Sequence, residues 1–315
     1  MPQAKANGLT LEYETFGRPQ APAILLVMGL GGQLTLWPDS FCQALAEAGY
    51  YVIRYDNRDV GLSSKIDEAG RPRLMRAGLA YTFGLPVKAG YTLDDMAQDA
   101  IGLLDALAIK HAHVIGTSMG GMIAQILAAK YPKRISSLVS LMSTSGNPRL
   151  PGPAWKIRMR LVKRPTTQDR ETLILHAMGT WRLICSPDYR PSEQELRASV
   201  ERGFDRSSHP RGLARQTLAI LASGSRLGLL AAIRAPTLII HGAADRLLPV
   251  AAAYELAEHI AGARLEIIPG MGHDLPEPLI PRIVASILRH FATAERPRLR
   301  ARALSYQPAL EANAA

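Results

Sequence analysis

The sequence predicts an α/β fold in which a mostly parallel sheet is covered by helices and interrupted by an all-helical insertion. Short apolar runs alternate with helix-period segments over residues 1–142, and the alternation returns over 231–293. Between them, residues 143–230 contain no strong strand pattern. Strands that alternate with helices form right-handed crossovers, which give a parallel sheet covered on both faces. We therefore expect a two-part core, a helical insertion and a flexible tail over 294–315.

Six short apolar runs are predicted to be strands of this sheet. Runs of this length without polar alternation are typical of strands that are buried on both faces. The opening segment, residues 9–17, alternates apolar and polar residues instead, which favours an antiparallel strand at the edge of the sheet. The six apolar runs cover residues 23–28, 51–55, 113–116, 135–142, 236–242 and 264–270.

The segments between these strands carry helix signals. Two capping boxes mark helix starts, Thr92 with Asp95 in the core and Ser192 with Glu195 in the insertion. The basic run WKIRMRLVKRP, residues 155–165, has the pattern of an amphipathic helix. Apolar residues at three- and four-residue spacing predict further helices over residues 96–107, 122–127 and 281–291.

Positive charge is concentrated in the insertion. Of the net charge of +10, residues 143–230 contribute +8, from 15 basic and 7 acidic side chains. A nucleic-acid-binding surface would interleave aromatic residues with such charges, and this segment does not. We interpret it as a solvated basic surface, with the steering of anionic substrates as the alternative.

The remaining composition excludes several classes of protein. The two cysteines, Cys42 and Cys185, form neither a disulfide framework nor a CxxC metal pair. The first residues lack the apolar region of a signal peptide, and no apolar run is long enough to cross a bilayer. These features predict a cytoplasmic protein without a membrane span that binds small molecules rather than nucleic acid. They do not predict an oligomeric state.

A serine lies at the joint between a predicted strand and a predicted helix. Gly116-Thr117-Ser118-Met119-Gly120 matches the pattern G-x-S-x-G, in which a sharp turn exposes the serine hydroxyl. The glycines at 116 and 120 suit so tight a turn. A glycine-rich packing joint or a phosphate cradle is the alternative, although neither GxGxxG nor GxxxxGK[ST] is present.

Two later strand ends supply the partners that a serine nucleophile needs. A serine hydroxyl requires a base, and the base requires an acid that orients it. Asp245 follows the predicted strand 236–242, and His273 follows the next one, so the chain order is Ser, Asp, His. Because the carboxyl ends of parallel strands meet at one edge, we expect these side chains to converge there. Neighbouring Asp274 is not expected to be the acid, because adjacent side chains seldom face each other in the geometry needed, and His241 is interpreted as a packing or turn residue.

Acyl transfer also needs hydrogen-bond donors for the oxyanion. The first expected donor is the backbone N–H of Met119, directly after the serine. The second should come from the loop that follows the first core strand, where Gly29, Gly31 and Gly32 let the backbone turn inward. Within that loop, the N–H of Leu30 is the predicted donor.

These segments resemble those of the α/β-hydrolase fold, and most closely the aclacinomycin-methylesterase-like carboxylesterases. The segments that carry the resemblance are LLVMG, WPDSF, YVIRYDNRDVGLSS, HVIGTSMGG, PTLIIHGAADRLLP and IPGMGHDLP, from residue 9 to 293. The oxyanion loop begins Met28-Gly29, where most of the superfamily has His-Gly. Asp59 stands where the family's D-x-R-G-x-G-x-S turn has glycine. Asp56 and Arg58 of that turn are expected to be structural.

The resemblance implies a carboxylesterase with catalytic Ser118, Asp245 and His273, and with no metal or organic cofactor. Its substrate would be a small to medium ester, with methyl esters among the candidates, and residues 143–230 would form a cap over the site. Met28, Trp155 and Trp181 are candidates for the substrate pocket, with packing in the cap as the other reading of the tryptophans.

Three other reactions and one non-catalytic role fit the same residues. Cofactor-free perhydrolysis or haloperoxidation, cleavage of activated C–C bonds and acyl transfer to an alcohol could all use the triad. A non-catalytic ligand-binding scaffold could also retain it. Labelling of Ser118 together with ester turnover would separate the enzymes from the scaffold.

Overall fold

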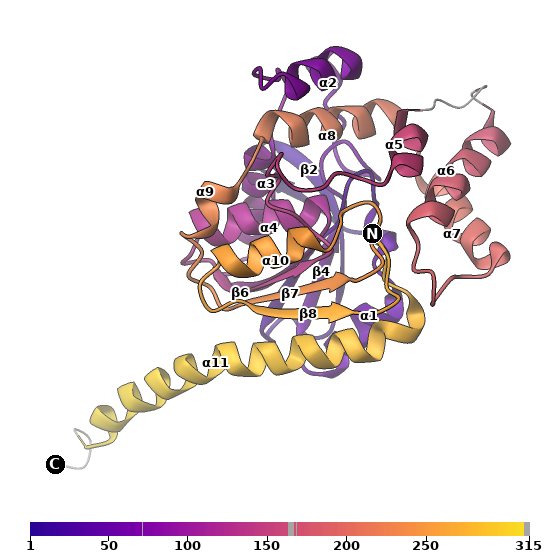
Figure 1. The fold of residues 1–315 in the computed structure, drawn as a ribbon. Coiled ribbons are helices and arrows are strands. Elements are labelled where there is room, and N and C mark those ends of the chain that lie inside the picture. Colours follow the sequence, from indigo (N-terminus) through magenta and orange to yellow (C-terminus); the bar gives the residue numbers. More distant parts are fainter. Residues whose placement is uncertain (71, 163–166, 168, 312–315) are drawn as a thin grey trace.

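The described part of the chain folds around an eight-stranded sheet with helices on both faces (Figure 1). The computed structural model describes residues 1–70, 72–162, 167 and 169–311. The strand order is β1-β2-β4-β3-β5-β6-β7-β8; the β1–β2 and β2–β4 pairs are antiparallel, and the later pairs are parallel. The strands are β1 Gln3–Ala6, β2 Leu9–Phe16, β3 Ala23–Val27, β4 Tyr51–Tyr55, β5 Ala112–Thr117, β6 Ile135–Leu141, β7 Thr237–Gly242 and β8 Arg264–Ile268.

Helices cover both faces of this sheet. Side chains of α3, α4 and α10 belong to the apolar cluster on one face, and those of α1 and α11 to the cluster on the other. Both faces of the sheet are therefore covered by apolar side chains and shielded from water, as is typical of a parallel sheet. The helices are α1 Asp39–Glu47, α2 Leu74–Thr82, α3 Leu93–Ala106, α4 Met119–Lys130, α5 Trp155–Val162, α6 Arg170–Ile184, α7 Glu193–Arg206, α8 Pro210–Ser223, α9 Leu227–Leu230, α10 Ala251–His259 and α11 Ile280–Glu311.

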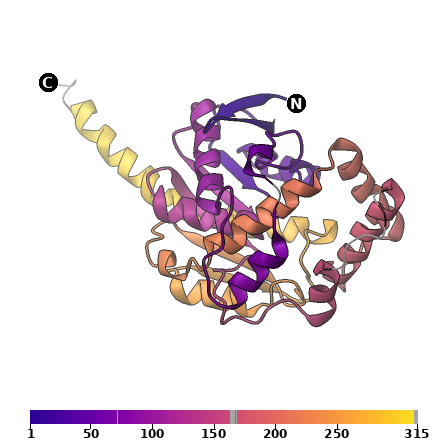
Figure 2. The ribbon, with the colours of Figure 1, turned by 90° about the horizontal axis from the view of Figure 1, so that it is seen from above.

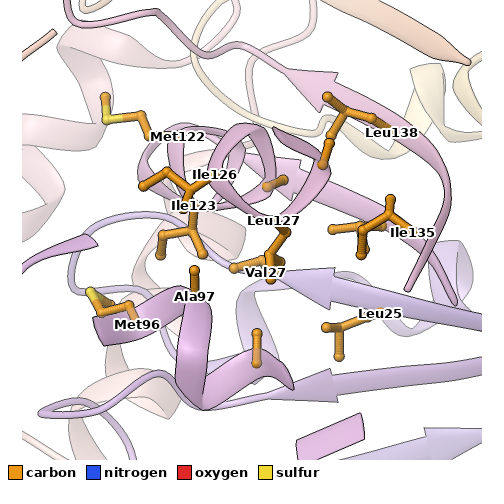
Figure 3. Close-up of a cluster of buried hydrophobic side chains, with 14 of the residues drawn as sticks. Leu25, Val27, Met96, Ala97, Met122, Ile123, Ile126, Leu127, Ile135 and Leu138 are labelled. Carbon is orange, nitrogen blue, oxygen red and sulfur yellow. The ribbon is translucent and has the colours of Figure 1, made fainter. Parts of the chain in front are cut away.

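Helix α4 lies at the centre of the larger cluster. From Met119 to Ala128 every residue of this helix is buried, which explains why its sequence is apolar nearly all round. Figure 3 shows its side chains against strands β3 and β6 and against helix α3. This packing fixes the start of α4, and with it the position of Ser118.

The insertion 143–230, called the cap below, contains α5 to α9. Both predicted capping boxes are confirmed, at the starts of α3 and α7. Helices α6 and α7 share a small apolar cluster of their own and lie beside the sheet, at the end away from the C-terminus of α11 (Figure 2). Helix α8 instead packs on α2 and α3. The predicted helix over 155–165 forms as α5, and residues 163–165 lie outside the described residues.

Two elements differ from the sequence prediction. Strand β2 is antiparallel, as expected, but it is not at the edge because β1 pairs with its free side. Asn7 and Gly8, with φ of 50° and 77°, form the two-residue turn that joins them. The last helix, α11, continues to Glu311 instead of ending before the expected tail, in a stretch rich in Ala, Arg and Leu. Residues 312–315 lie outside the described residues.

The strand order places the loop after β3 beside the turn after β5. From β3 the chain adds β4 on one side and β5 on the other, so the order reverses between β3 and β5. Loops that leave two such strands at their carboxyl ends diverge and leave a crevice between them. The loop after β3 and Ser118 after β5 are the two segments at this point.

Candidate active site

Ser118 occupies a strained turn between β5 and α4. Its φ of 54° and ψ of −120° are unusual for a residue with a side chain. The two glycines around it permit this turn because a Cβ at Gly116 would lie 2.2 Å from the Gly120 carbonyl oxygen, and one at Gly120 would lie 1.9 Å from that of Val27. The backbone N–H of Ser118 donates to Leu141 O at 3.0 Å. The turn is thereby tied to three strands.

The structure brings Ser118, His273 and Asp245 into one hydrogen-bonded chain. His273 Nε2 lies 3.0 Å from Ser118 Oγ, and His273 Nδ1 lies 2.6 Å from Asp245 Oδ2. Since a carboxylate only accepts, Nδ1 carries the hydrogen, and Nε2 is left to accept from the serine hydroxyl. The side chains come from the ends of β5, β7 and β8, as the sequence order predicted.

Asp245 is held as a carboxylate by its surroundings. Its Oδ1 accepts from the backbone N–H groups of Leu247 and Leu248, each at 2.8 Å. Burial alone would raise the pKa of Asp245, but the His273 and His241 rings outweigh burial and hold this pKa well below its usual range. His241 Nε2 donates to Leu248 O at 2.7 Å and lies 3.4 Å from Asp245 Oδ2. His241 therefore contacts the acid in addition to packing, which the sequence interpretation missed.

Asp274 makes its hydrogen bonds to Ser186 and, among the described contacts, none to the His273 ring. Its Oδ1 accepts from the backbone N–H of Ser186 at 3.0 Å and from the Ser186 hydroxyl. Burial raises the pKa of Asp274, against the opposing effect of these bonds. The backbone N–H of His273 also donates to Ile184 O at 2.8 Å. The end of α6 and the residues after it thus hold the histidine loop.

Two backbone amides next to Ser118 lack partners. The loop after β3 reaches Ser118, since a Cβ at Gly29 would lie 3.1 Å from the Ser118 Cβ. Within the described part of the chain, neither the Leu30 N–H nor the Met119 N–H donates to any protein acceptor. An unpaired pair of N–H groups beside a serine hydroxyl is what an oxyanion needs.

The segment after β4 supports this loop. Asn57 Nδ2 donates to Met28 O at 3.0 Å, and Asp56 Oδ1 accepts from the Leu34 N–H at 2.7 Å. Arg58 pairs with Asp99 of α3 at 2.6 Å. Asp56 and Arg58 thus make the structural contacts that the sequence predicted.

Asp59 has a role that sequence reasoning did not assign. Its φ is 69°, a value that suits the glycine usual at this position. Its carboxylate is fully buried and receives both Nε and Nη2 of Arg215 from α8, each at 2.7 Å. Burial would raise the pKa of Asp59, but the bonds from Arg215 and its other partners lower it. The aspartate at position 59, where glycine is usual, was the sequence signal for this contact with Arg215, which anchors the cap.

The three predicted pocket residues have different surroundings. Met28 is buried in the cluster with α1 and α11. Trp155, at the start of α5, is 70% exposed. Trp181 packs against the small cluster of the cap. Contact between these side chains and a substrate remains a prediction.

The described residues offer no competing metal site or thiolate. No group of three or more His, Cys, Asp or Glu side chains among them could hold a metal ion. Both cysteines are free and buried, and burial raises the pKa of each thiol to about 12. In the same ranges, no helix is both long and apolar enough to cross a membrane.

Comparison with known proteins identifies the family of this fold. The model of the family described as alpha/beta hydrolase fold matches residues 22–277, most of the chain. The chain belongs to the α/β-hydrolase family. The resemblance read from the sequence is therefore confirmed.

This α/β-hydrolase is similar in sequence to two proteins that are named methylesterases. It is 32% identical to rhodomycin D methylesterase DauP of Streptomyces sp. (strain C5) and 30% identical to DnrP of Streptomyces peucetius. Each alignment covers 91% of this chain and 96% of the relative. Among solved structures, the enol-lactonase from Burkholderia xenovorans LB400 is 25% identical, with a TM-score of 0.72 over 92% of this chain and all of that one. The chain is an enzyme of the hydrolase class that acts on ester bonds.

Proposed function

We propose that this hydrolase is a serine carboxylesterase that works through an acyl-enzyme. The observation that carries the proposal is the continuous Ser118–His273–Asp245 chain beside two unpaired backbone amides. Each part has a separate task in acyl transfer, and all of them lie at one crevice.

The first half of the reaction forms the acyl-enzyme. Ser118 Oγ attacks the ester carbonyl carbon while His273 Nε2 takes the hydroxyl proton. The Leu30 and Met119 N–H groups bind the oxyanion of the tetrahedral intermediate. Asp245, ionised throughout, stabilises the imidazolium that forms. The intermediate collapses when His273 gives its proton to the departing alcohol oxygen.

The second half releases the acid. A water molecule loses a proton to His273 as it attacks the acyl carbon, and the oxyanion forms again at the same two amides. Collapse of this intermediate breaks the bond to Ser118 Oγ, which recovers its proton from His273. The net reaction consumes the ester and one water molecule and gives a carboxylic acid and an alcohol, and the three residues return to their starting protonation states.

We further propose that the cap forms one wall of the substrate site and that methyl esters are among the substrates. The contacts of Ile184 and Ser186 with the histidine loop support the first point. The second rests on the two similar proteins, each named a methylesterase, which align over nearly their whole lengths.

Labelling and turnover together test the proposal. A fluorophosphonate should modify Ser118 alone, as peptide mass spectrometry would show, and the purified chain should hydrolyse p-nitrophenyl esters. A panel of methyl, ethyl and butyl esters would then rank the alcohol groups. Peroxide-dependent halogenation faster than ester hydrolysis, or ester formation with an added alcohol as the main product, would contradict hydrolysis as the main activity. No labelling and no turnover would refute a catalytic role.

A further inference from the structure

A buried glutamine of the cap reaches into the oxyanion loop. Gln216 lies on α8 and its side chain is fully buried. Its Oε1 accepts from the Gly31 N–H at 2.8 Å, and its Nε2 donates to Arg58 O at 2.8 Å. The two bonds use opposite ends of one planar amide, so they fix both the position and the orientation of that amide.

The bond to Gly31 falls on the central peptide of a tight turn. The Gly32 N–H donates to Gly29 O at 3.1 Å, which closes a turn with Leu30 and Gly31 as its central residues. Gly31 has a φ of 67°, whereas Leu30 does not have a positive φ. This combination is that of a type II turn. A type I turn would present the opposite face of the Leu30–Gly31 peptide, and its Gly31 N–H would no longer point at Gln216.

The hydrogen bond that closes this turn, from the Gly32 N–H to Gly29 O, sets the direction of the Leu30 N–H. The peptide between Gly29 and Leu30 is planar, with its carbonyl and its N–H on opposite sides. Since the carbonyl faces Gly32, the N–H points away from the interior of the turn. Gly29 approaches Ser118, so this peptide lies beside the nucleophile.

We propose that Gln216 is a positioning residue: by binding the Gly31 N–H it holds the closed Gly29–Gly32 turn in place, and with it the Leu30 N–H that faces the reacting carbonyl. This inference rests on the serine esterase mechanism proposed above. Gln216 does not contact Ser118, His273 or Asp245 through any described hydrogen bond. It acts through the Gly31 peptide, from a helix more than 180 residues away in sequence.

Other contacts hold the cap in place without Gln216. Arg215 binds Asp59, and Arg206 binds Asp56 Oδ2 at 2.8 Å. Gln33 Nε2 donates to the carbonyls of Gly203 and Ser207, at 2.6 and 2.9 Å. None of these bonds reaches the central peptide of the turn. Loss of Gln216 should therefore free the turn while the cap stays docked.

The test replaces Gln216 by methionine, which keeps the length of the side chain and removes both hydrogen bonds. We expect Q216M to lower kcat for p-nitrophenyl acetate about 10- to 100-fold, because loss of one oxyanion donor outright costs about 10²–10³. KM should stay within about twofold. The rate of fluorophosphonate labelling should fall in parallel, since the phosphonyl oxygen needs the same two donors.

The matched control is Q125M. Gln125 is another fully buried helical glutamine, and its Nε2 donates to Thr144 O at 3.3 Å, away from the oxyanion loop. Q125M should keep its labelling rate and its kcat. Q216E retains an acceptor for the Gly31 N–H, so its kcat should lie between those of wild type and Q216M. Should Q216M not fold, Q216N with Q125N as its control gives the same comparison, because Asn is too short to span both partners.

The outcomes separate the two proposals. Wild-type protein that neither hydrolyses esters nor reacts with the fluorophosphonate would refute the proposed function. An active wild type with kcat and labelling equal in Q216M and Q125M would overturn the role of Gln216 alone. A larger loss in Q216M, with KM preserved and partial recovery in Q216E, would support it.

Discussion

Ser118, His273 and Asp245 lie at the carboxyl ends of the parallel strands, called the sheet edge below. This sheet edge and the cap are held by different kinds of contact. At the sheet edge, the backbone of Ser118 is fixed by its neighbouring strands, by the buried apolar helix α4 and by close backbone contacts that only glycine permits at 116 and 120. The cap shares apolar contacts with the core through Ala219 and Leu230, and polar side chains join it to the sheet edge as well. Arg206 and Arg215 bind Asp56 and Asp59 in one turn, and Gln216 binds the neighbouring loop.

This difference distinguishes the proposed reacting groups from the proposed wall of the substrate site. Ser118, His273 and Asp245 depend on contacts that also form the core, so their geometry is as stable as the fold. Besides its apolar contacts, the cap has a few buried charged and amide groups, and removing one of them leaves a buried partner with fewer hydrogen bonds. Changes at the sheet edge should abolish turnover in a folded protein, whereas changes at the cap contacts should alter stability or tune the rate.

The largest expected effect comes from the sheet edge. Ser118→Ala should lower kcat for p-nitrophenyl esters about 10⁴- to 10⁶-fold with an unchanged circular dichroism spectrum, because the nucleophile is lost and the fold is not. Ser140→Ala is the matched control, since that buried hydroxyl on β6 has no partner among the described residues. Near-normal turnover in Ser118→Ala would contradict the role of Ser118.

A stability measurement tests the anchor of the cap. Arg215→Met leaves the Asp59 carboxylate buried without its arginine, with the Tyr91 hydroxyl and the Ile66 N–H as its remaining hydrogen-bond donors, so the free energy of unfolding in urea should fall by about 3–5 kcal/mol. Arg182→Met removes a pair with Glu193 in which both side chains are exposed, and it should cost about 0–1 kcal/mol. Equal losses in the two variants would show that the buried pair is not what anchors the cap.

The third prediction concerns the stability of the core against acid. Burial, with Arg264 and His113 adding to it, lowers the pKa of His290 on α11 to about 4 from an ordinary 6.5. Unfolded protein therefore takes up this proton first, and stability should fall as the pH drops from 6.5 to 4, by about 1–3 kcal/mol. Urea unfolding at several pH values should show a shallower fall in His290→Gln.

The control for this pH effect is the exposed His259. His259→Gln should leave the fall in stability between pH 6.5 and 4 as it is in wild type. If His290→Gln kept the full slope, the effect would have to come from other groups.

The smallest expected effect tests the charge of the cap. If the cap steers anionic substrates, kcat/KM for acidic esters should fall about two- to fivefold between low and physiological salt, with neutral esters unaffected. The effect should be modest because several cap arginines already pair with acids, as Arg170 does with Asp205 and Arg197 with Glu171. Equal salt responses of the two esters would favour a solvated surface without a steering role.

Much of the fold was predictable because its signals are local. Apolar runs and helical spacing specified the six core strands and the helices between them. Strand β1 was missed although Asn7-Gly8 is a strong hairpin signal, because residues 3–6 before this turn lack an apolar pattern. The contact of His241 with Asp245 was missed because a histidine within a strand gives no sign of its partner.

The sequence by itself determined the class of fold and the three residues that meet at its edge. Strand ends and chain order are enough for that, since parallel strands bring their carboxyl ends together whatever the loops contain. Only the tertiary structure decided how the cap is attached. Arg215 meets Asp59 across 156 positions, and Gln216 meets Gly31 across 185. Such pairs form when packed helices bring two buried polar groups within reach, and no periodicity in the sequence records that distance.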